Sequence, residues 1–126
     1  MTARTPEDLD RQFAEALNAG KLDALVALYE PNATLMPQPG KLVTGTAAIR
    51  EALAQLLAGK PKMTLNPKLI AQSGDIAVLT AKWDLVMTGA DGKPTQMSGR
   101  SAEVVRRQSD GSWLFVIDLP FGPGAQ

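Results

Sequence analysis

The chain has 126 residues, 44% of them hydrophobic and 21% charged, which is the balance of a single globular domain spanning residues 1–126. Lysine and arginine together number 13, as do aspartate and glutamate, so no excess of charge would attract nucleic acid or an anionic membrane. Cysteine and histidine are both absent, which excludes disulfides, thiolate or imidazole metal ligands and histidine acid–base chemistry. Any proton transfer must use carboxyl groups, the tyrosine or lysines, and we expect no cofactor and no metal.

No segment of the sequence directs the chain to a membrane. The apolar runs all fall short of the ~18 residues that a spanning helix needs. The first residues, MTARTPE, lack the apolar stretch of a signal peptide. We therefore expect a cytoplasmic protein that binds neither membranes nor nucleic acid.

The first part of the chain predicts two helices. The first begins after Thr5, a favourable N-cap that is followed by proline and two acidic residues. Apolar residues then recur at helical spacing until Gly20, which is placed where a left-handed residue ends a helix. A second, shorter helix carries apolar residues as far as Tyr29 and is stopped by Pro31.

A short extended segment and a third helix follow. We expect residues 33–36 to lie at an edge or rim of a sheet, because Pro37 and Pro39 cannot donate hydrogen bonds to a neighbouring strand. The third helix is predicted to start at Thr46 as its cap and to end at Gly59.

The second half of the sequence predicts four strands in an antiparallel meander, at residues 64–72, 76–88, 96–107 and 113–119. Helices followed by a meander make an α+β domain with the helices on one face of the sheet. In residues 113–119 both faces of the strand are mostly apolar. Because three helices cover only one face, we expect the other face to pack against a second copy of the chain in a homodimer.

This order of elements resembles the nuclear transport factor 2-like superfamily, in particular its SnoaL-like and ketosteroid-isomerase branch. The residues that carry the resemblance are 16–23, 26–29, 32–34 and 44–51, and the tail at 103–113 is similar to other members of the superfamily. The resemblance implies a cystatin-like, cone-shaped fold, in which three N-terminal helices cover the concave face of a curved antiparallel sheet. This scaffold hosts isomerases, dehydratases, epoxide hydrolases, cyclases and binding proteins.

The resemblance also shows which isomerase residues this chain lacks. Ketosteroid isomerases use an aspartate base, with a tyrosine and a protonated aspartate holding the oxyanion. Here the base position falls on Pro37 or Gln38 and the tyrosine position on Phe13, so that only the second acid has a counterpart, Glu103. Chemistry similar to that of scytalone dehydratase would need histidines, which are absent.

Two carboxylates, Glu103 and Asp118, are the candidate catalytic residues. A turn of four residues, 109–112, would place them opposite each other on one face, with Val105 opposite Val116; a turn of three would point them to opposite faces. Side by side in a half-buried pocket the two carboxyl groups could not both ionise cheaply, so the pKa of one would rise and a proton shuttle would become possible.

The alternative is a structural role for both acids. Glu103 would then form a salt bridge with Arg50, Arg100 or Arg107, and Asp118 would cap a strand end. Three further acids, Asp8, Asp10 and Asp23, are interpreted as separate helix-end residues rather than a metal site.

We expect an apolar cavity between the helices and the sheet, although the same side chains could instead fill a solid core. Trp83 and Tyr29 are the stronger candidates for its wall, because each brings a hydrogen-bond donor that needs a partner when buried. The full set of predicted ligand-binding residues is Phe13, Leu17, Tyr29, Met36, Gln38, Leu53, Leu57, Trp83, Glu103, Val105, Val116 and Asp118.

The leading hypothesis is a protein that binds a small hydrophobic molecule in this cavity, with no assigned activity. The alternative is a lyase or isomerase in which Asp118 is the base and Glu103 the acid or oxyanion donor. A third possibility is a dimerisation domain with a filled core.

Overall fold

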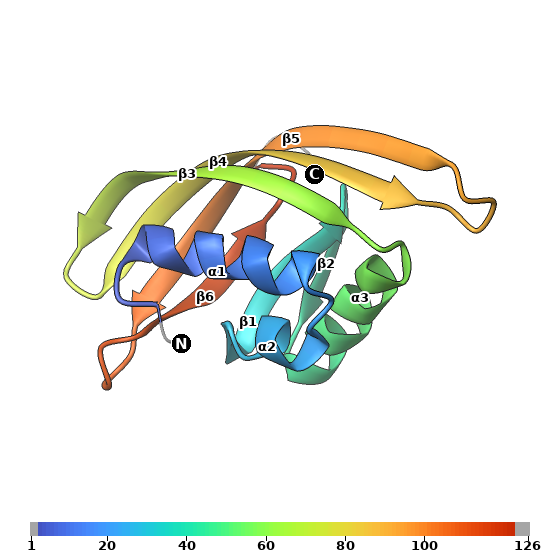
Figure 1. The fold of residues 1–126 in the computed structure, drawn as a ribbon. Coiled ribbons are helices and arrows are strands. Elements are labelled where there is room, and N and C mark those ends of the chain that lie inside the picture. The colour runs from blue at the N-terminus through green and yellow to red at the C-terminus, as the bar shows by residue number, and fades with distance from the viewer. Residues whose placement is uncertain (1–2, 123–126) are drawn as a thin grey trace.

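A curved six-stranded sheet packs around three helices in the computed structural model, which describes residues 3–122 (Figure 1). The helices are α1 (Pro6–Asn18), α2 (Leu22–Val26) and α3 (Thr46–Ala58). The strands are β1 (Tyr29–Gln38), β2 (Lys41–Thr44), β3 (Lys62–Ser73), β4 (Ile76–Thr88), β5 (Pro94–Arg107) and β6 (Trp113–Leu119). Their order in the sheet is β2-β1-β6-β5-β4-β3. The predicted α+β class, with helices against the concave face of a curved sheet, is confirmed.

The ends of α1 follow the sequence signals closely. The Thr5 side chain accepts a hydrogen bond from the Asp8 N–H at 3.2 Å, and Gly20 has a φ of 69°, the left-handed conformation that glycine tolerates best. The start of α3 differs from the prediction, because Gly45 occupies the N-cap position and Thr46 is the first helical residue. The Thr46 hydroxyl instead donates to the Pro31 carbonyl at 3.5 Å.

The segment around residues 29–38 corrects the sequence prediction most strongly. The second helix ends at Val26, and Tyr29 starts a ten-residue strand, β1, that lies between β2 and β6 rather than at the edge. The edge strand at this end of the sheet is β2, which the sequence did not predict. Pro31 falls within a register shift in the pairing with β6 and Pro37 within a shift in the pairing with β2, so neither proline interrupts a regular ladder. The pairing of β1 with β6 is parallel, so the sheet is not purely antiparallel.

The hairpin between β5 and β6 contains a β-bulge. The Gln108 N–H donates to the Ser112 carbonyl at 2.7 Å, which leaves residues 109–111 in the turn. With this register alone, the two candidate acids would point to opposite faces of the sheet. The pairing, however, shifts between Val104 and Val105, and this shift places one extra residue on β6. Glu103 therefore lies directly opposite Asp118 as predicted, whereas the neighbouring Val105 lies opposite Phe115 and not opposite Val116.

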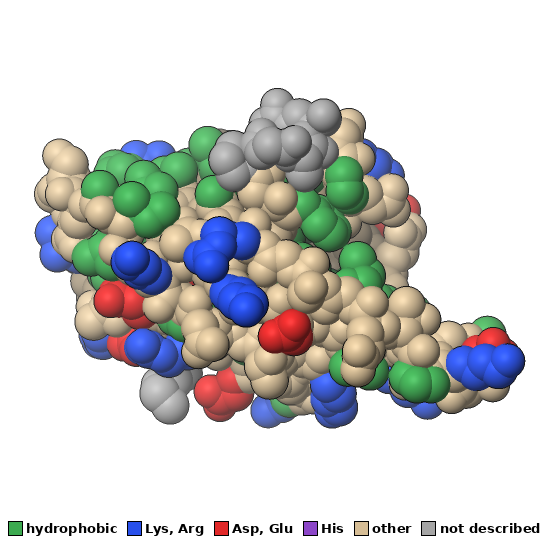
Figure 2. All heavy atoms as spheres, turned by 90° about the horizontal axis from the view of Figure 1, so that it is seen from above, with side chains coloured by type: hydrophobic (Ala, Val, Ile, Leu, Met, Phe, Trp, Pro, Cys, Tyr) green, Lys and Arg blue, Asp and Glu red, His purple; other side chains and the backbone are tan. Residues whose placement is uncertain are grey.

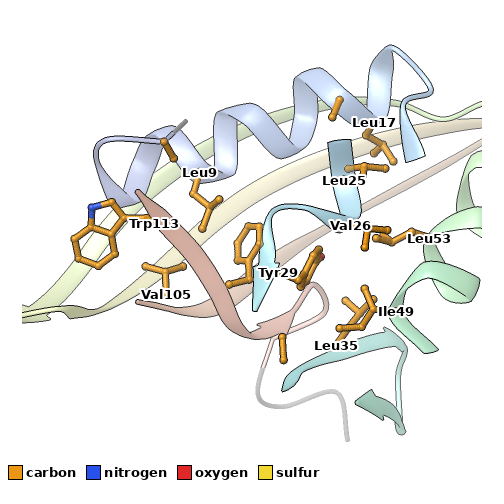
Figure 3. Packing of buried hydrophobic residues seen from close by; sticks show 14 of the residues in the cluster. Leu9, Leu17, Leu25, Val26, Tyr29, Leu35, Ile49, Leu53, Val105 and Trp113 are labelled. Atoms are coloured by element: carbon orange, nitrogen blue, oxygen red, sulfur yellow. The ribbon is translucent and has the colours of Figure 1, made fainter. Parts of the chain in front are cut away.

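The hydrophobic core fills the space between the helices and one part of the concave face. Figure 3 shows Leu9 of α1, Leu25 of α2 and Ile49 of α3 approaching the sheet, and all three are completely buried. No helix in residues 3–122 is long and apolar enough to cross a membrane.

The outer face of the sheet carries an apolar row. Val78, Val104 and Ile117 are register partners on three neighbouring strands. They alternate with buried inward-facing residues, and Ile117 is 38% exposed. Figure 2, seen from above the sheet, shows groups of hydrophobic side chains on this side of the molecule among basic and acidic side chains.

We expect Leu17→Ala to lower the free energy of unfolding by about 2–5 kcal/mol, since Leu17 is 1% exposed and its loss leaves a cavity in the core. Leu42→Ala is the matched control, because Leu42 is 57% exposed and its loss should change stability by less than about 0.5 kcal/mol. Urea unfolding measures both. Equal losses in the two variants would contradict the described packing of α1.

Candidate functional site

A cavity of about 660 Å³ lies between the concave face of the sheet and helices α1 and α3. Most of its wall is apolar, with aromatic rings from Phe13, Trp83, Phe115 and Phe121. Charged side chains are found at two places. Lys41 and Glu51 are exposed and stand at the rim, whereas three buried acids form what we call the acid floor: Asp10, Glu103 and Asp118.

Asp118 is held by the tyrosine. It is 5% exposed, and its Oδ2 accepts a hydrogen bond from the Tyr29 hydroxyl at 2.5 Å. Tyr29 begins β1, and β1 runs parallel to β6, so the pairing of these two strands brings the two side chains together. The bulge on β6 then points Asp118 to the concave face beside Glu103.

Glu103 is paired with a third acid that the sequence analysis assigned to a helix end. Asp10 lies in the interior of α1, is 3% exposed and comes within hydrogen-bonding reach of Glu103. Asp10 Oδ2 and Glu103 Oε1 are buried and have no hydrogen-bond donor among the described residues. A single proton held between the two carboxyl groups would supply one donor to this pair. Asp10 precedes Phe13 by three residues and Leu17 by seven, and this helical spacing was the signal that it faces inward.

Burial sets the protonation of the acid floor. Burial, then the charges of Asp10 and Asp118, raise the pKa of Glu103 well above its usual range. Burial raises the pKa of Asp118 to about 7, against the opposing effect of the hydrogen bond from Tyr29. Burial likewise raises the pKa of Asp10 to about 6, although the hydrogen bond with Glu103 lowers it. Burial and the two neighbouring charges therefore favour the protonated form of Glu103, whereas Asp10 and Asp118 can carry charge near neutral pH.

The alternative of a salt-bridged Glu103 does not agree with the structure. Arg50 pairs with Asp23 at 2.9 Å and Arg107 with Asp75 at 2.7 Å, both near the surface. Arg100 is exposed on β5, where it alternates with the inward-facing Ser101. No arginine or lysine in residues 3–122 forms a salt bridge with the acid floor.

Half of the predicted ligand-binding residues line the cavity, namely Phe13, Gln38, Leu53, Trp83, Glu103 and Asp118. The others lie elsewhere. Leu17, Met36 and Val105 are buried in the core, and Tyr29 is behind Asp118. Leu57 and Val116 are half-buried outside the lining, Val116 because the bulge removes it from the position opposite Val105. The rest of the wall is made of residues outside the predicted set, chiefly from β2, α3 and the ends of β3 to β5.

Trp83 is fixed by a partner in the chain itself. Its Nε1–H donates to the Pro120 carbonyl at 2.7 Å, and its ring meets the edge of Phe121 with centroids 5.8 Å apart. A side chain at Gly99 would collide with this ring, because a Cβ there would lie 2.7 Å from Trp83 Cζ2. The expectation that the buried indole needs a partner is confirmed, and its N–H is not free for a ligand.

The sequence profile of the SnoaL-like domain matches residues 11–116. The epoxide hydrolase LasB of Streptomyces lasalocidi is 33% identical over 91 residues, which are 71% of this chain and 31% of LasB. The chain therefore spans about a third of the length of this curated relative.

Solved structures show the same fold. A ketosteroid isomerase-like protein from Erwinia carotovora superposes with a TM-score of 0.78 at 21% identity, over 89% of this chain and 88% of the other. A nuclear transport factor 2-like superfamily protein from Salmonella enterica gives a TM-score of 0.78 at 16% identity, over 89% and 84%.

We expect the stability of the protein to fall as the pH rises from about 4 to about 7, because the folded chain keeps carboxyl protons that the unfolded chain releases. Asp118, with its pKa raised from 3.8 to about 7, should account for up to about 4 kcal/mol of this loss. Asp118→Asn retains an acceptor for the Tyr29 hydroxyl and removes the titration, so its stability should change less between about pH 5 and about pH 8. Urea unfolding at both pH values tests this.

Asp75→Asn is the control, since Asp75 is a carboxylate whose side chain is 66% exposed. It should keep the pH dependence of the wild type. If Asp118→Asn keeps it as well, Asp118 does not have the raised pKa described above.

Proposed function

The chain belongs to the SnoaL-like domain family, and from this we propose that it binds a small, largely apolar molecule and catalyses a proton transfer on it. The observation that carries the proposal is the acid floor: three buried carboxyl groups and a tyrosine at one end of an apolar cavity. Pockets that bind small molecules typically combine an apolar wall with a few polar groups that converge. Carboxyl groups with pKa values near or above neutrality are suited to general acid and base catalysis.

The three carboxyl groups divide into an acid and a base. Glu103 holds a proton near neutral pH and is the proposed acid, which gives the proton to an oxygen of the substrate. Asp118 can be ionised at the same pH and is the proposed base, and the Tyr29 hydroxyl fixes its orientation at 2.5 Å. The apolar wall excludes water, so that the charges of the reaction are stabilised by these fixed groups.

The position of the proposed base differs from that in ketosteroid isomerases. In this chain Pro37 and Gln38 stand at the isomerase base position, and both line the cavity but cannot accept a proton. Phe13 lines the cavity at the tyrosine position and has no hydroxyl to donate. The acid floor supports the same reaction class, an isomerisation or elimination, from another side of the cavity. The similarity to LasB adds the acid-assisted opening of an epoxide to the reactions to be tested.

A second candidate function is binding without chemistry. It is favoured by the missing carboxylate at the isomerase base position, where Pro37 and Gln38 stand. The same cavity would then hold an apolar ligand, and the acid floor would contribute only to its recognition.

The two functions can be separated with isophorone, a small apolar cyclic enone. We expect the wild type to accelerate deuterium exchange at the protons adjacent to its carbonyl and conjugated system in D2O, as followed by ¹H NMR. Asp118→Asn should lose most of this acceleration, by about 10²–10⁴-fold, which is the usual contribution of a general base. Asp84→Asn on the exposed face of β4 is the control and should retain it. Binding of isophorone without exchange above the buffer rate would support the binding function instead.

We also propose that the chain forms a homodimer through the outer face of the sheet. The row of Val78, Val104 and Ile117 crosses three strands there, and Ala102 and Leu119 form the next pair along the same face. An apolar face of this kind is stabilised when a second copy removes it from water.

Ile117→Glu should therefore convert the dimer to a monomer, because it would bury a charge at the centre of the interface. Leu42→Glu is a matched control on the edge strand β2, where the side chain is 57% exposed. Light scattering coupled to size-exclusion chromatography measures the mass. A monomeric wild type would exclude this interface.

A further inference from the structure

The acid floor offers hydrogen-bond acceptors to a ligand and almost no donors. The Tyr29 hydroxyl is used by Asp118 and the Trp83 N–H by the Pro120 carbonyl. The Ser101 hydroxyl lies within reach of the Ala81 backbone and of Glu103, both within the protein. A carboxylate entering this end of the cavity would find no free donor apart from the carboxyl proton of the floor itself.

Two of the acceptors are unsatisfied. Asp10 Oδ2 and Glu103 Oε1 have no donor in residues 3–122, and each residue is only 3% exposed while lining the cavity. A proton shared by the two carboxyl groups supplies one donor to the pair, whereas two carboxyl groups have acceptor sites for several donors. Buried polar atoms without a partner are costly, so the floor favours a ligand that donates.

The negative charge of the acid floor also favours a ligand that donates hydrogen bonds, in particular a cation. The Asp10–Glu103 pair with one proton is still an anion, and no lysine or arginine pairs with it among the described residues. Lys41 is the only basic side chain in the lining, and it is exposed at the rim. The rings of Phe13 and Phe115, with centroids 6.1 Å apart, both line the cavity beside the acids, and aromatic rings attract organic cations. No group of three acids in residues 3–122 converges as ligands of a metal ion would.

We propose that the molecule accepted by this cavity carries a basic nitrogen and binds as an ammonium ion against Asp10 and Glu103. The inference rests on the proposed function, since it concerns the same site and names the chemical class of its ligand. The ammonium N–H groups supply the donors that Asp10 and Glu103 lack, and the positive charge balances a buried negative one. Asp118 keeps its hydrogen bond from Tyr29 and can still act as the base on the rest of the molecule.

Three probes with one apolar skeleton test the proposal: 1-adamantylmethylamine, 1-adamantanemethanol and 1-adamantanecarboxylate. Calorimetric titration of the wild type should show the amine binding at least about tenfold more tightly than the alcohol, as expected for a hydrogen bond to a charged group. The carboxylate should bind more weakly than the alcohol, because it has no donor and repels the floor. Equal affinities, or a preference for the carboxylate, would overturn the proposal.

Asp10→Asn should remove the preference for the amine and keep the binding of the alcohol. Glu15→Gln is the matched control, because it removes an exposed carboxylate from the same helix and should leave the preference unchanged. If Asp10→Asn does not fold, the wild type alone decides through the pH dependence of amine binding between about pH 8 and about pH 5. The pKa of Asp10 is about 6, so the pair of Asp10 and Glu103 loses its negative charge at the lower pH and the preference for the amine should fall. Asp118 and Tyr29 belong to the same site, and Arg11 and Glu7 act on Asp10 from the same helix. A preference that is the same at both pH values would overturn the proposal.

The outcomes also separate this inference from the proposed function. Selection of the amine without deuterium exchange in isophorone would leave the ligand class standing and remove the catalytic proposal. Deuterium exchange without any preference among the three probes would leave the catalytic proposal standing and remove the ligand class.

Discussion

The burial of three carboxyl groups between helix α1 and the concave face of the sheet is the constraint on which the rest of the site depends. An ionised carboxylate is poorly stabilised away from water, so a chain that buries three of them without a basic partner must keep protons on some of them. Here the arrangement is specific: Asp10 lies within hydrogen-bonding reach of Glu103, and Asp118 accepts a hydrogen bond from Tyr29. Tyr29 itself packs in the core against Phe115, with ring centroids 5.0 Å apart. The three acids line the cavity, where a bound molecule can replace the water that these groups lost.

One extra residue in β6 makes this arrangement possible. The turn of three residues at 109–111 sets a register in which Asp118 would face the outer side of the sheet. The β-bulge at Val116 corrects that register over the last part of the strand, so that Phe115 and Asp118 both face inward. Bulges are often found next to active sites, where they redirect a side chain. The outward position of Ile117 and the inward position of Asp118 are thus two results of the same irregularity.

The sequence predicted the architecture well because its signals are local. The cap at Thr5, the turn at Gly20 and the alternation along β4 each depend on neighbouring residues. The errors concern features that depend on distant contacts. Residues 33–36 were expected at an edge because of Pro37 and Pro39. Only the pairing of the whole sheet shows that Pro37 lies at a register shift and that Pro39 lies beyond the end of β1.

The acid floor was predictable only in part, for a similar reason. The opposition of Glu103 and Asp118 was one of two registers that the sequence allowed, and the bulge that selects it has no clear signal in residues 113–119. Asp10 was overlooked because an acid near the start of a helix is usually stabilised there by the helix dipole. Its spacing from Phe13 was visible in the sequence, but its partner Glu103 is far along the chain.

The order of the strands has a consequence for how the protein forms. β6 is the last strand to be synthesised, yet it lies in the middle of the sheet between β1 and β5. Tyr29 and Asp118 are 89 positions apart in the chain, so the two halves of the cavity remain separate until β6 inserts between them. Contacts over such separations close slowly. A chain emerging from the ribosome would therefore expose the edges of β1 and β5 until β6 has emerged, and in this interval a chaperone or a second nascent copy could pair with them.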